Sequence, residues 1–323
     1  FREDPGPSGF LEEAFLMQPD EILDYLIPGI MLGALYAVIA IGYTLVYGVL
    51  QLINFAHSEV FMVGAYSSLL ALTWIDPSSN PTTFMSVLLV AAGLAVSGTA
   101  GAATAFTLEK VAYRPLRRRN APRLAFLISA IGASYFLQNL AGKLFGRDSR
   151  ALPTVFENKK VFSVFGTQVT ILQLLIVCAA VLMMVGLDYL VNRTKLGSGI
   201  RAVAQDAETA GLMGVDIDKV ISRTFIIGGF MGGIAGFLFG LHLQLSFTMG
   251  FLPGITAFAA AVVGGIGNIR GAMMGGMLLG IVESFSSPIF GESWRYVSAF
   301  AVLVLVLMFR PTGILGERLG RSA

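Results

Sequence analysis

Long apolar segments, separated by short polar ones, dominate the chain. A helix needs about 20 predominantly apolar residues to cross roughly 30 Å of hydrocarbon. Segments of this kind lie at residues 29–50, 54–74, 84–108, 124–142, 170–187, 271–288 and 294–309. Residues 224–269 carry no Asp, Glu, Lys or Arg and would form a helix of about 69 Å, roughly twice the hydrocarbon thickness. This stretch must therefore turn back on itself, and Pro253-Gly254 is the natural place for the turn.

The pattern predicts an all-α, polytopic α-helical membrane protein with broken or re-entrant helices. The predicted protein has about eight or nine transmembrane segments, depending on whether residues 255–267 span or re-enter the membrane. Composition agrees, because 55% of the residues are hydrophobic and only 13% are charged, whereas about 25% are charged in an average soluble protein. The small excess of 22 Lys and Arg over 20 Asp and Glu offers no basic face to nucleic acid, which is therefore not an expected partner.

Charge along the chain suggests a division into regions. Residues 1–27 form an N-terminal tail and an interfacial helix, since residues 10–27 mix apolar with acidic side chains and are too charged to span. Residues 28–316 form the transmembrane domain, and residues 317–323 a C-terminal tail. The Lys- and Arg-rich segment 109–123 is expected in the cytoplasm. Alternation of the spans then places a second cytoplasmic loop at residues 192–223.

Small residues recur at every fourth position in two of the apolar segments. The two stripes are Gly228, Gly232, Gly236 and Gly240, and Gly93, Ser97, Gly101 and Ala105. Small residues at this spacing let helices approach closely in lipid, so we interpret both stripes as helix-packing surfaces. The alternative is that they line a substrate path.

Signatures of an enzyme are absent from the sequence. It contains no His-Glu-x-x-His motif and no Gly-x-Ser-x-Gly motif, and its 2 histidines lie far apart. No Gly-x-x-x-x-Gly-Lys-Ser/Thr loop is present to hold the phosphates of ATP. We therefore expect a chain that is not an enzyme and has no metal site or cofactor of its own, so that any ATP hydrolysis belongs to a partner.

Polar residues interrupt the apolar pattern at positions 51–59. Such residues are costly within lipid, so they are expected to face protein, a water-filled cavity or the interface. Asn54 can cap the helix that follows, with His57 and Glu59 in its first turn, where the helix dipole favours a carboxylate. The functional alternative is a broken helix of the kind that forms transport pathways.

Three further polar positions are candidates for the pathway or its gate. A second interruption at residues 264–271 contains Arg270, which we expect to be a counter-charge for Glu59. Glu283 lies deep in its segment and could meet a substrate ammonium group or a proton, or it could mark the outer water interface. Gln244 is expected near the outer end of its helix. The candidate pathway residues are Asn54, His57, Glu59, Gln244, Arg270 and Glu283.

The segment 197–223 contains the signals of a short, ordered helix. Asp206 can cap a helix at residues 207–213, and Gly214 supplies the left-handed conformation with which helices commonly end. A compact amphipathic helix between two spans can dock in a groove of a partner protein. The alternative is a solvated connecting loop.

Several motifs resemble those of the branched-chain amino acid permeases of ABC importers, specifically the smaller of the two permease subunits. The resemblance covers residues 28–316. Its segments are residues 34–48, Asn-Phe-Ala-His-Ser-Glu at 54–59, Val-Ala-Tyr-Arg-Pro-Leu-Arg at 111–117, 127–132, Ala-Val-Val-Gly-Gly-Ile-Gly-Asn within 257–271, and Pro-Thr-Gly-Ile-Leu-Gly at 311–316. Ser58 stands where the family usually has Gly, which bears on how closely another backbone can approach.

Residues 208–214 resemble the Glu-Ala-Ala-x-x-x-Gly loop through which such permeases contact their ATPase subunits, with Thr209 replacing the middle Ala. The resemblance assigns ATPase coupling to Glu208, Ala210 and Gly214. Gln205 and Asp206 lie beside them in the sequence. The resemblance also implies a second homologous permease subunit, two ATP-binding subunits that hold ATP and magnesium, and a periplasmic substrate-binding protein. It implies a multi-pass protein of the bacterial inner membrane.

The expected function is the import of branched-chain or other neutral amino acids by alternating access, driven by the partner ATPases. Two alternatives stay open. One is a urea or short-amide permease of the same family. The other is a secondary transporter in which His57, Glu59 or Glu283 titrates and a proton gradient drives uptake.

Overall fold

The computed structural model describes residues 19–75, 81–156, 159–164, 167–291 and 294–316. Its helices are α2 (Pro19–Leu50), α3 (His57–Ile75), α4 (Thr83–Leu108), a π-helical turn (Glu109–Tyr113), α5 (Arg114–Arg118), α6 (Arg123–Phe145), α7 (Ile171–Arg193), α8 (Lys195–Gln205), α9 (Ala207–Leu212), α10 (Ile217–His242), α11 (Phe251–Gly264), α12 (Ile269–Phe290) and α13 (Arg295–Phe309). Strands β1 (Lys160–Val164) and β2 (Thr167–Thr170) form an antiparallel hairpin.

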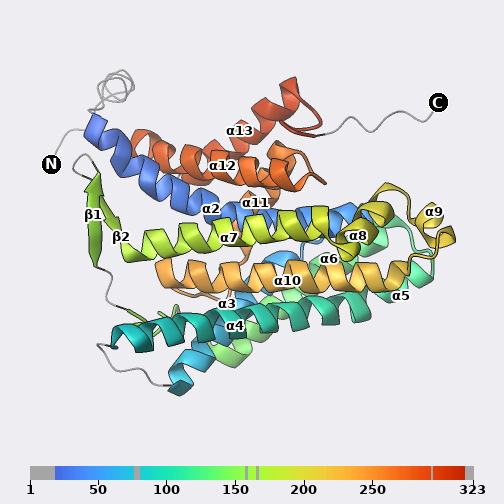
Figure 1. Cartoon of the computed structure of the whole chain (residues 1–323), viewed down its shortest axis with the longest axis horizontal. Helices are drawn as coiled ribbons and strands as arrows, with labels where there is room; N and C mark the ends of the chain where they lie inside the picture. The colour runs from blue at the N-terminus through green and yellow to red at the C-terminus, as the bar shows by residue number, and fades with distance from the viewer. Residues whose placement is uncertain (1–18, 76–80, 157–158, 165–166, 292–293, 317–323) are drawn as a thin grey trace.

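Within this described part, seven helices are long and apolar enough to cross a membrane, and α11 and α13 are shorter apolar helices. The prediction of an all-α polytopic membrane protein is confirmed. The long helices run roughly side by side, with α5, α8 and α9 at one end of the bundle and the β1–β2 hairpin at the other (Figure 1). We call these the α9 end and the hairpin end.

Helix α2 lies in the centre of the bundle and is buried along most of its length. Close packing with α12 depends on glycine, because a Cβ on Gly280 would lie 2.1 Å from the backbone nitrogen of Gly33. A Cβ on Gly276 would lie 2.4 Å from the Cα of Ala37. These two helices therefore touch backbone to backbone, which is the packing that small residues allow in lipid.

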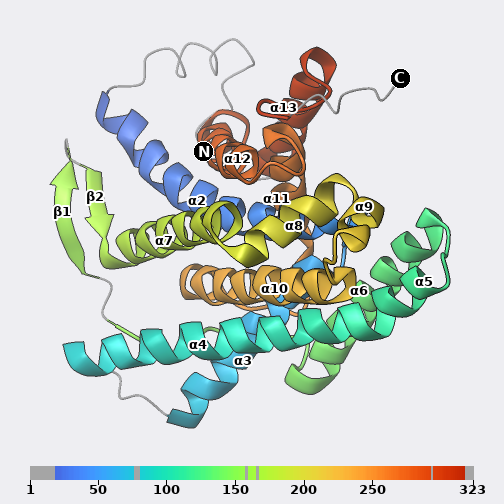
Figure 2. The same ribbon diagram turned by 45° about the vertical axis from the view of Figure 1, so that its right-hand side comes forward.

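Helix α10 lies between α4, α3 and α2, and Figure 2 shows it alongside α4. The four glycines expected to pack do so to different degrees. A Cβ on Gly236 would lie 2.1 Å from the Phe61 carbonyl oxygen of α3, whereas one on Gly228 would meet no atom closer than 3.5 Å. A Cβ on Gly232 or Gly240 would instead meet side-chain atoms first, at 3.3 and 2.8 Å respectively.

The turn in the apolar stretch 224–269 is not at Pro253-Gly254. Helix α10 ends at His242, residues 243–250 form the connection, and Pro253 lies in the first turn of α11. Proline is tolerated there because the first backbone N–H groups of a helix have no intrahelical partner. The 14 residues of α11 extend only about 21 Å, too short to span the membrane.

The N-terminal boundary also differs from the expectation. Residues 19–27 are not a separate interfacial helix but the first turns of α2, which continues through Pro28. Contacts with α12 hold these turns in line, since the Ser284 hydroxyl donates to the Tyr25 carbonyl at 2.6 Å and the Tyr25 ring contacts Phe285. The expected tails lie outside the described residues, at 1–18 and 317–323.

Candidate functional site

The expected short helix after Asp206 is present as α9. The Asp206 carboxylate accepts hydrogen bonds from the backbone N–H groups of Glu208 and Thr209 at 3.0 and 3.1 Å, and from the Thr209 hydroxyl. The bond from this hydroxyl, followed by the amide bonds, lowers the pKa of the Asp206 carboxyl below its ordinary value. Gly214, with φ +86°, follows the end of the helix. A charged cap and a glycine stop therefore define α9 at neutral pH.

Helix α9 has one inward and one outward face. Ala210 is buried against the bundle, while Glu208 and Thr209 are exposed. Leu212 and Met213 are 85% and 81% exposed, which leaves two large adjacent apolar side chains on the surface. Such side chains at the end of a capped helix favour a protein interface.

Two of these assignments could not be read from the motif. Ala210 anchors α9 instead of facing outward, and Leu212 and Met213 were not among the candidates. The available signal was the position of two large apolar residues directly before the helix-ending glycine. A helix as short as Ala207–Leu212 cannot bury both of its sides.

The segment 192–223 contains a second helix, α8, which the sequence reasoning did not predict. Thr194 caps it by accepting from the Gly197 backbone N–H at 3.1 Å. A Cβ on Gly197 would lie 2.1 Å from the Val191 carbonyl oxygen, so glycine allows α8 to fold back sharply on α7. Ile200 and Val203 are buried in the same apolar cluster as Ala210. Helix α8 thus fixes the position of α9 on the bundle.

The polar interruption 51–59 forms a break between α2 and α3. The Asn54 side-chain oxygen accepts from the Ala56 backbone N–H at 3.1 Å and from the Tyr113 hydroxyl at 2.6 Å. Asn54 therefore stabilises the turn just before α3, whereas a conventional cap would bond to the first turn of the helix itself. His57 begins α3 and, as expected, Glu59 lies in its first turn.

His57 and Glu59 are both buried, at 1% exposure each. The His57 ring lies against Gly232, in the central part of α10, and edge-on to Tyr43 at 4.9 Å between ring centroids. Glu59 Oε1 accepts from the Ser134 hydroxyl of α6 at 3.2 Å. The beginning of α3 thus lies within the helical bundle.

The N-terminus of α11 meets the N-terminus of α3 at this position. A Cβ on Gly250, the residue before α11, would lie 2.4 Å from the Ser58 carbonyl oxygen and 3.1 Å from Glu59 Oε2. A Cβ on Gly254 would lie 2.4 Å from the Ser58 Cβ. Close backbone approach to Ser58 is therefore provided from the opposite side, by Gly250 directly before α11 and by Gly254 in α11. The N-termini of both helices therefore lie close to the Glu59 carboxylate, where the helix dipole favours a negative charge.

The expected pairing of Arg270 with Glu59 is wrong. Arg270 Nε lies 3.1 Å from the Asp188 carboxylate near the end of α7, and Glu59 instead accepts from Ser134. The turn between α11 and α12 brings Arg270 next to the end of α7, while Glu59 lies between helices of the bundle. Two isolated charges in a sequence do not identify their partners.

Glu283 forms an internal ion pair. It is 0% exposed, and Arg295 Nε lies 2.6 Å from its Oε1, which also accepts from the Tyr36 hydroxyl at 3.0 Å. The Glu283 carboxylate is therefore enclosed by protein and paired across to α13. Gln244 is exposed and, with His242 and residues 151–156, lines a cavity of about 290 Å³ at the hairpin end.

Membrane-length helices, a break within the bundle and an exposed capped helix at one end are the features of a multi-pass membrane protein. No group of three or more His, Cys, Asp or Glu that could hold a metal ion occurs among the residues described. Residues 25–309 match the family described as "Branched-chain amino acid transport system / permease component", and the chain belongs to that family. The resemblance inferred from its motifs is confirmed.

Two relatives illustrate this similarity. The chain is 43% identical over 302 residues to the high-affinity branched-chain amino acid transport system permease protein BraD of Pseudomonas aeruginosa, covering 91% of this chain and 96% of that protein. It is 42% identical over 299 residues to the permease protein LivH of the corresponding Escherichia coli K12 system, with the same coverage. The solved structure of PsaBC from Streptococcus pneumoniae in complex with Fab aligns with 94% of this chain and 96% of that chain, at 13% identity and a TM-score of 0.41.

Proposed function

We propose that this chain is the membrane-spanning permease subunit of an ABC importer that moves branched-chain or other neutral amino acids into the cytoplasm. The exposed face of α9 carries the proposal, because it combines a charged cap, a glycine stop and two exposed apolar side chains on an anchored helix. The relatives are named as permeases of branched-chain amino acid transport systems, which supports branched-chain amino acids as the substrate class.

The proposed complex contains this chain, a second homologous permease, two ATP-binding subunits and a periplasmic substrate-binding protein in the bacterial inner membrane. ATP and magnesium belong to the ATP-binding subunits, which dock on α9. Their closure on ATP moves α8 and α9, and the permease pair changes from outward-open to inward-open. Glu208, Gln205 and Asp206 lie at this surface, Gly214 ends α9 and Ala210 anchors it.

Uptake into sealed vesicles tests this function against a proton-driven transporter. We expect leucine uptake that persists with a protonophore and stops when ATP is withheld from the ATPase side. Loss of uptake with the protonophore alone would contradict the proposal. Replacing leucine by urea or a short amide, each with the cognate binding protein, tests the remaining alternative within the family.

Truncation of the exposed apolar side chains on α9 tests the docking surface. Leu212→Ala and Met213→Ala are each expected to weaken binding of the ATP-binding subunits by about tenfold, corresponding to about 1.4 kcal/mol. Titration of these subunits against the permease in detergent measures the affinity.

Leu212→Met is the matched control, since it keeps a large apolar side chain and is expected to retain the affinity. Because both side chains are exposed, the free energy of unfolding should change by no more than about 0.5 kcal/mol in any of the three variants. Unchanged affinity in both alanine variants would remove this face of α9 from the interface.

A further inference from the structure

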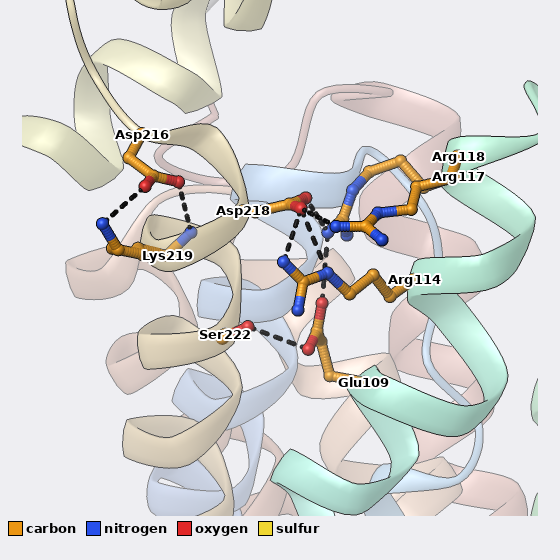
Figure 3. A network of polar contacts seen from close by, with 8 residues as sticks. All are labelled: Glu109, Arg114, Arg117, Arg118, Asp216, Asp218, Lys219 and Ser222. Carbon is orange, nitrogen blue, oxygen red and sulfur yellow. Dashed lines mark hydrogen bonds and ion pairs between the residues drawn. The ribbon is translucent and has the colours of Figure 1, made fainter.

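We infer that a polar network at the end of α4 passes the movement of α9 to the junction of α3 and α11, with the Tyr113–Asn54 hydrogen bond as its last link. The inference rests on the proposed function, since it requires an ATPase that acts on α9. It assigns positioning roles to residues outside the docking surface. The network comprises Glu109, Arg114, Arg117, Arg118, Asp218 and Ser222, and we call it the clasp (Figure 3).

The first step joins α9 to α10. The two helices are separated only by residues 213–216, and the Val215 backbone N–H donates to the Ala210 carbonyl at 3.0 Å. A Cβ on Gly211 would lie 3.1 Å from Ile217 Cδ1, so α9 packs directly on the first residue of α10. A displacement of α9 therefore displaces the beginning of α10.

The second step joins α10 to the π-helical turn and α5, which directly follow α4, through the clasp. Arg114 donates to the Asp218 carboxylate from Nε at 3.0 Å and from Nη2 at 2.6 Å, and Arg117 donates to its other oxygen at 2.6 Å. Glu109 is 0% exposed and accepts from Arg117 at 3.1 Å and from the Ser222 hydroxyl at 2.8 Å.

This network differs from an ordinary surface salt bridge. An isolated exposed ion pair contributes little, whereas here both oxygens of the Asp218 carboxylate are held, one by Arg114 and the other by Arg117. Arg117 bonds to both Glu109 and Asp218, so one side chain connects the buried and the half-exposed carboxylates. The clasp therefore holds α10 in one orientation relative to the π-helical turn and α5.

The third step runs through the π-helical turn Glu109–Tyr113, which connects α4 to α5. Such turns are rare and often occur at functional sites. This one carries Glu109 of the clasp at one end and Tyr113 at the other. Tyr113 is fully buried, packs against Phe225 with ring centroids 5.3 Å apart, and donates to Asn54 at 2.6 Å.

Asn54 belongs to the break between α2 and α3, and a second contact reaches the same break. Gln51, a non-glycine residue with φ 54°, donates from its side chain to the Ala204 carbonyl of α8 at 3.5 Å. Backbone in this conformation is strained and is found at switch regions. The break is followed directly by His57 and by Glu59, which faces the N-terminus of α11. Movement at the α9 end thus reaches the place where two broken helices meet.

The simplest alternative is a static brace, in which the clasp only stabilises the fold. The ratio of amino acid taken up to ATP hydrolysed separates the two roles. A brace changes the amount of assembled complex, while a transmitting network changes this ratio in the complex that assembles.

The test uses the complete complex in proteoliposomes, with the binding protein and radiolabelled leucine as the probe. Asp218→Asn and Tyr113→Phe are each expected to lower leucine uptake per ATP by about tenfold, within the range of coupling between sites. ATP hydrolysis per assembled complex should continue. Asp216→Asn is the matched control, because it lies in the same turn, bonds to Lys219 instead of the clasp, and keeps a side chain that caps α10.

The double variant Tyr113→Phe/Asp218→Asn is expected to be no worse than the more severe single variant, because both changes interrupt one series of contacts. An unchanged uptake-to-ATP ratio in both single variants would overturn the inference, even if less complex assembles. An equal fall of the uptake-to-ATP ratio in Asp216→Asn would also overturn the inference. Failure of the wild-type complex to take up leucine with ATP would instead contradict the proposed function.

Discussion

Gly236→Ala is expected to destabilise the helical bundle strongly, because the added Cβ would lie 2.1 Å from the backbone carbonyl oxygen of Phe61. A backbone atom cannot rotate away as a side chain can, so α10 and α3 must separate. Overpacking of this kind costs about 1–3 kcal/mol, and thermal unfolding of the purified permease in detergent measures it.

Gly228→Ala is the matched control on the same helix. Its Cβ would meet no atom closer than 3.5 Å, which is ordinary van der Waals contact. Alanine is favoured over glycine inside a helix by roughly 1 kcal/mol, so this variant should be neutral or slightly stabilising. Equal destabilisation by the two alanines would show that α10 does not approach α3 as closely as described.

Arg295→Met is expected to have the second large effect, through the buried carboxylate of Glu283. The substitution removes the guanidinium from beside a side chain that is 0% exposed. Removal of one member of a buried ion pair costs about 3–5 kcal/mol, because the remaining charge stays out of water. The measurement is the unfolding temperature together with the yield of monodisperse protein.

Glu283→Gln provides the comparison. The amide can still accept from the Tyr36 hydroxyl, and the Arg295 side chain that loses its partner is less buried, at 25% exposure, than the Glu283 side chain, at 0%. This variant should therefore be destabilised less than Arg295→Met. The opposite order would show that an unpaired Arg295 guanidinium costs the fold more than an unpaired Glu283 carboxylate, contrary to their exposures of 25% and 0%.

The parts of the protein that the sequence predicted depend on neighbours along the chain. Helices long enough to span follow from runs of apolar residues, and α9 follows from an aspartate cap and a glycine stop around a single short helix. The packing role of Gly236 could also be predicted, because glycines at every fourth position lie on one face of a helix. Each of these signals is contained in one continuous stretch of the sequence and does not depend on distant residues.

The tertiary structure alone decided the pairings. Arg270 pairs with Asp188, Glu283 with Arg295, and Asn54 with Tyr113. The partner of a polar side chain depends on which helix ends meet, and composition or periodicity carries no information about that. For the same reason the sequence did not distinguish Gly236 from Gly228, whose spacing is equivalent and whose opposing atoms are not.

By itself, then, the sequence determined that this chain crosses the membrane repeatedly and presents a capped helix between two spans, since hydrophobicity and capping are local properties. The position of that helix on the bundle, the meeting of α3 and α11 at Glu59 and the clasp at Asp218 came only from the folded chain. Each joins residues far apart in sequence, and only the packing of the helices brings them together.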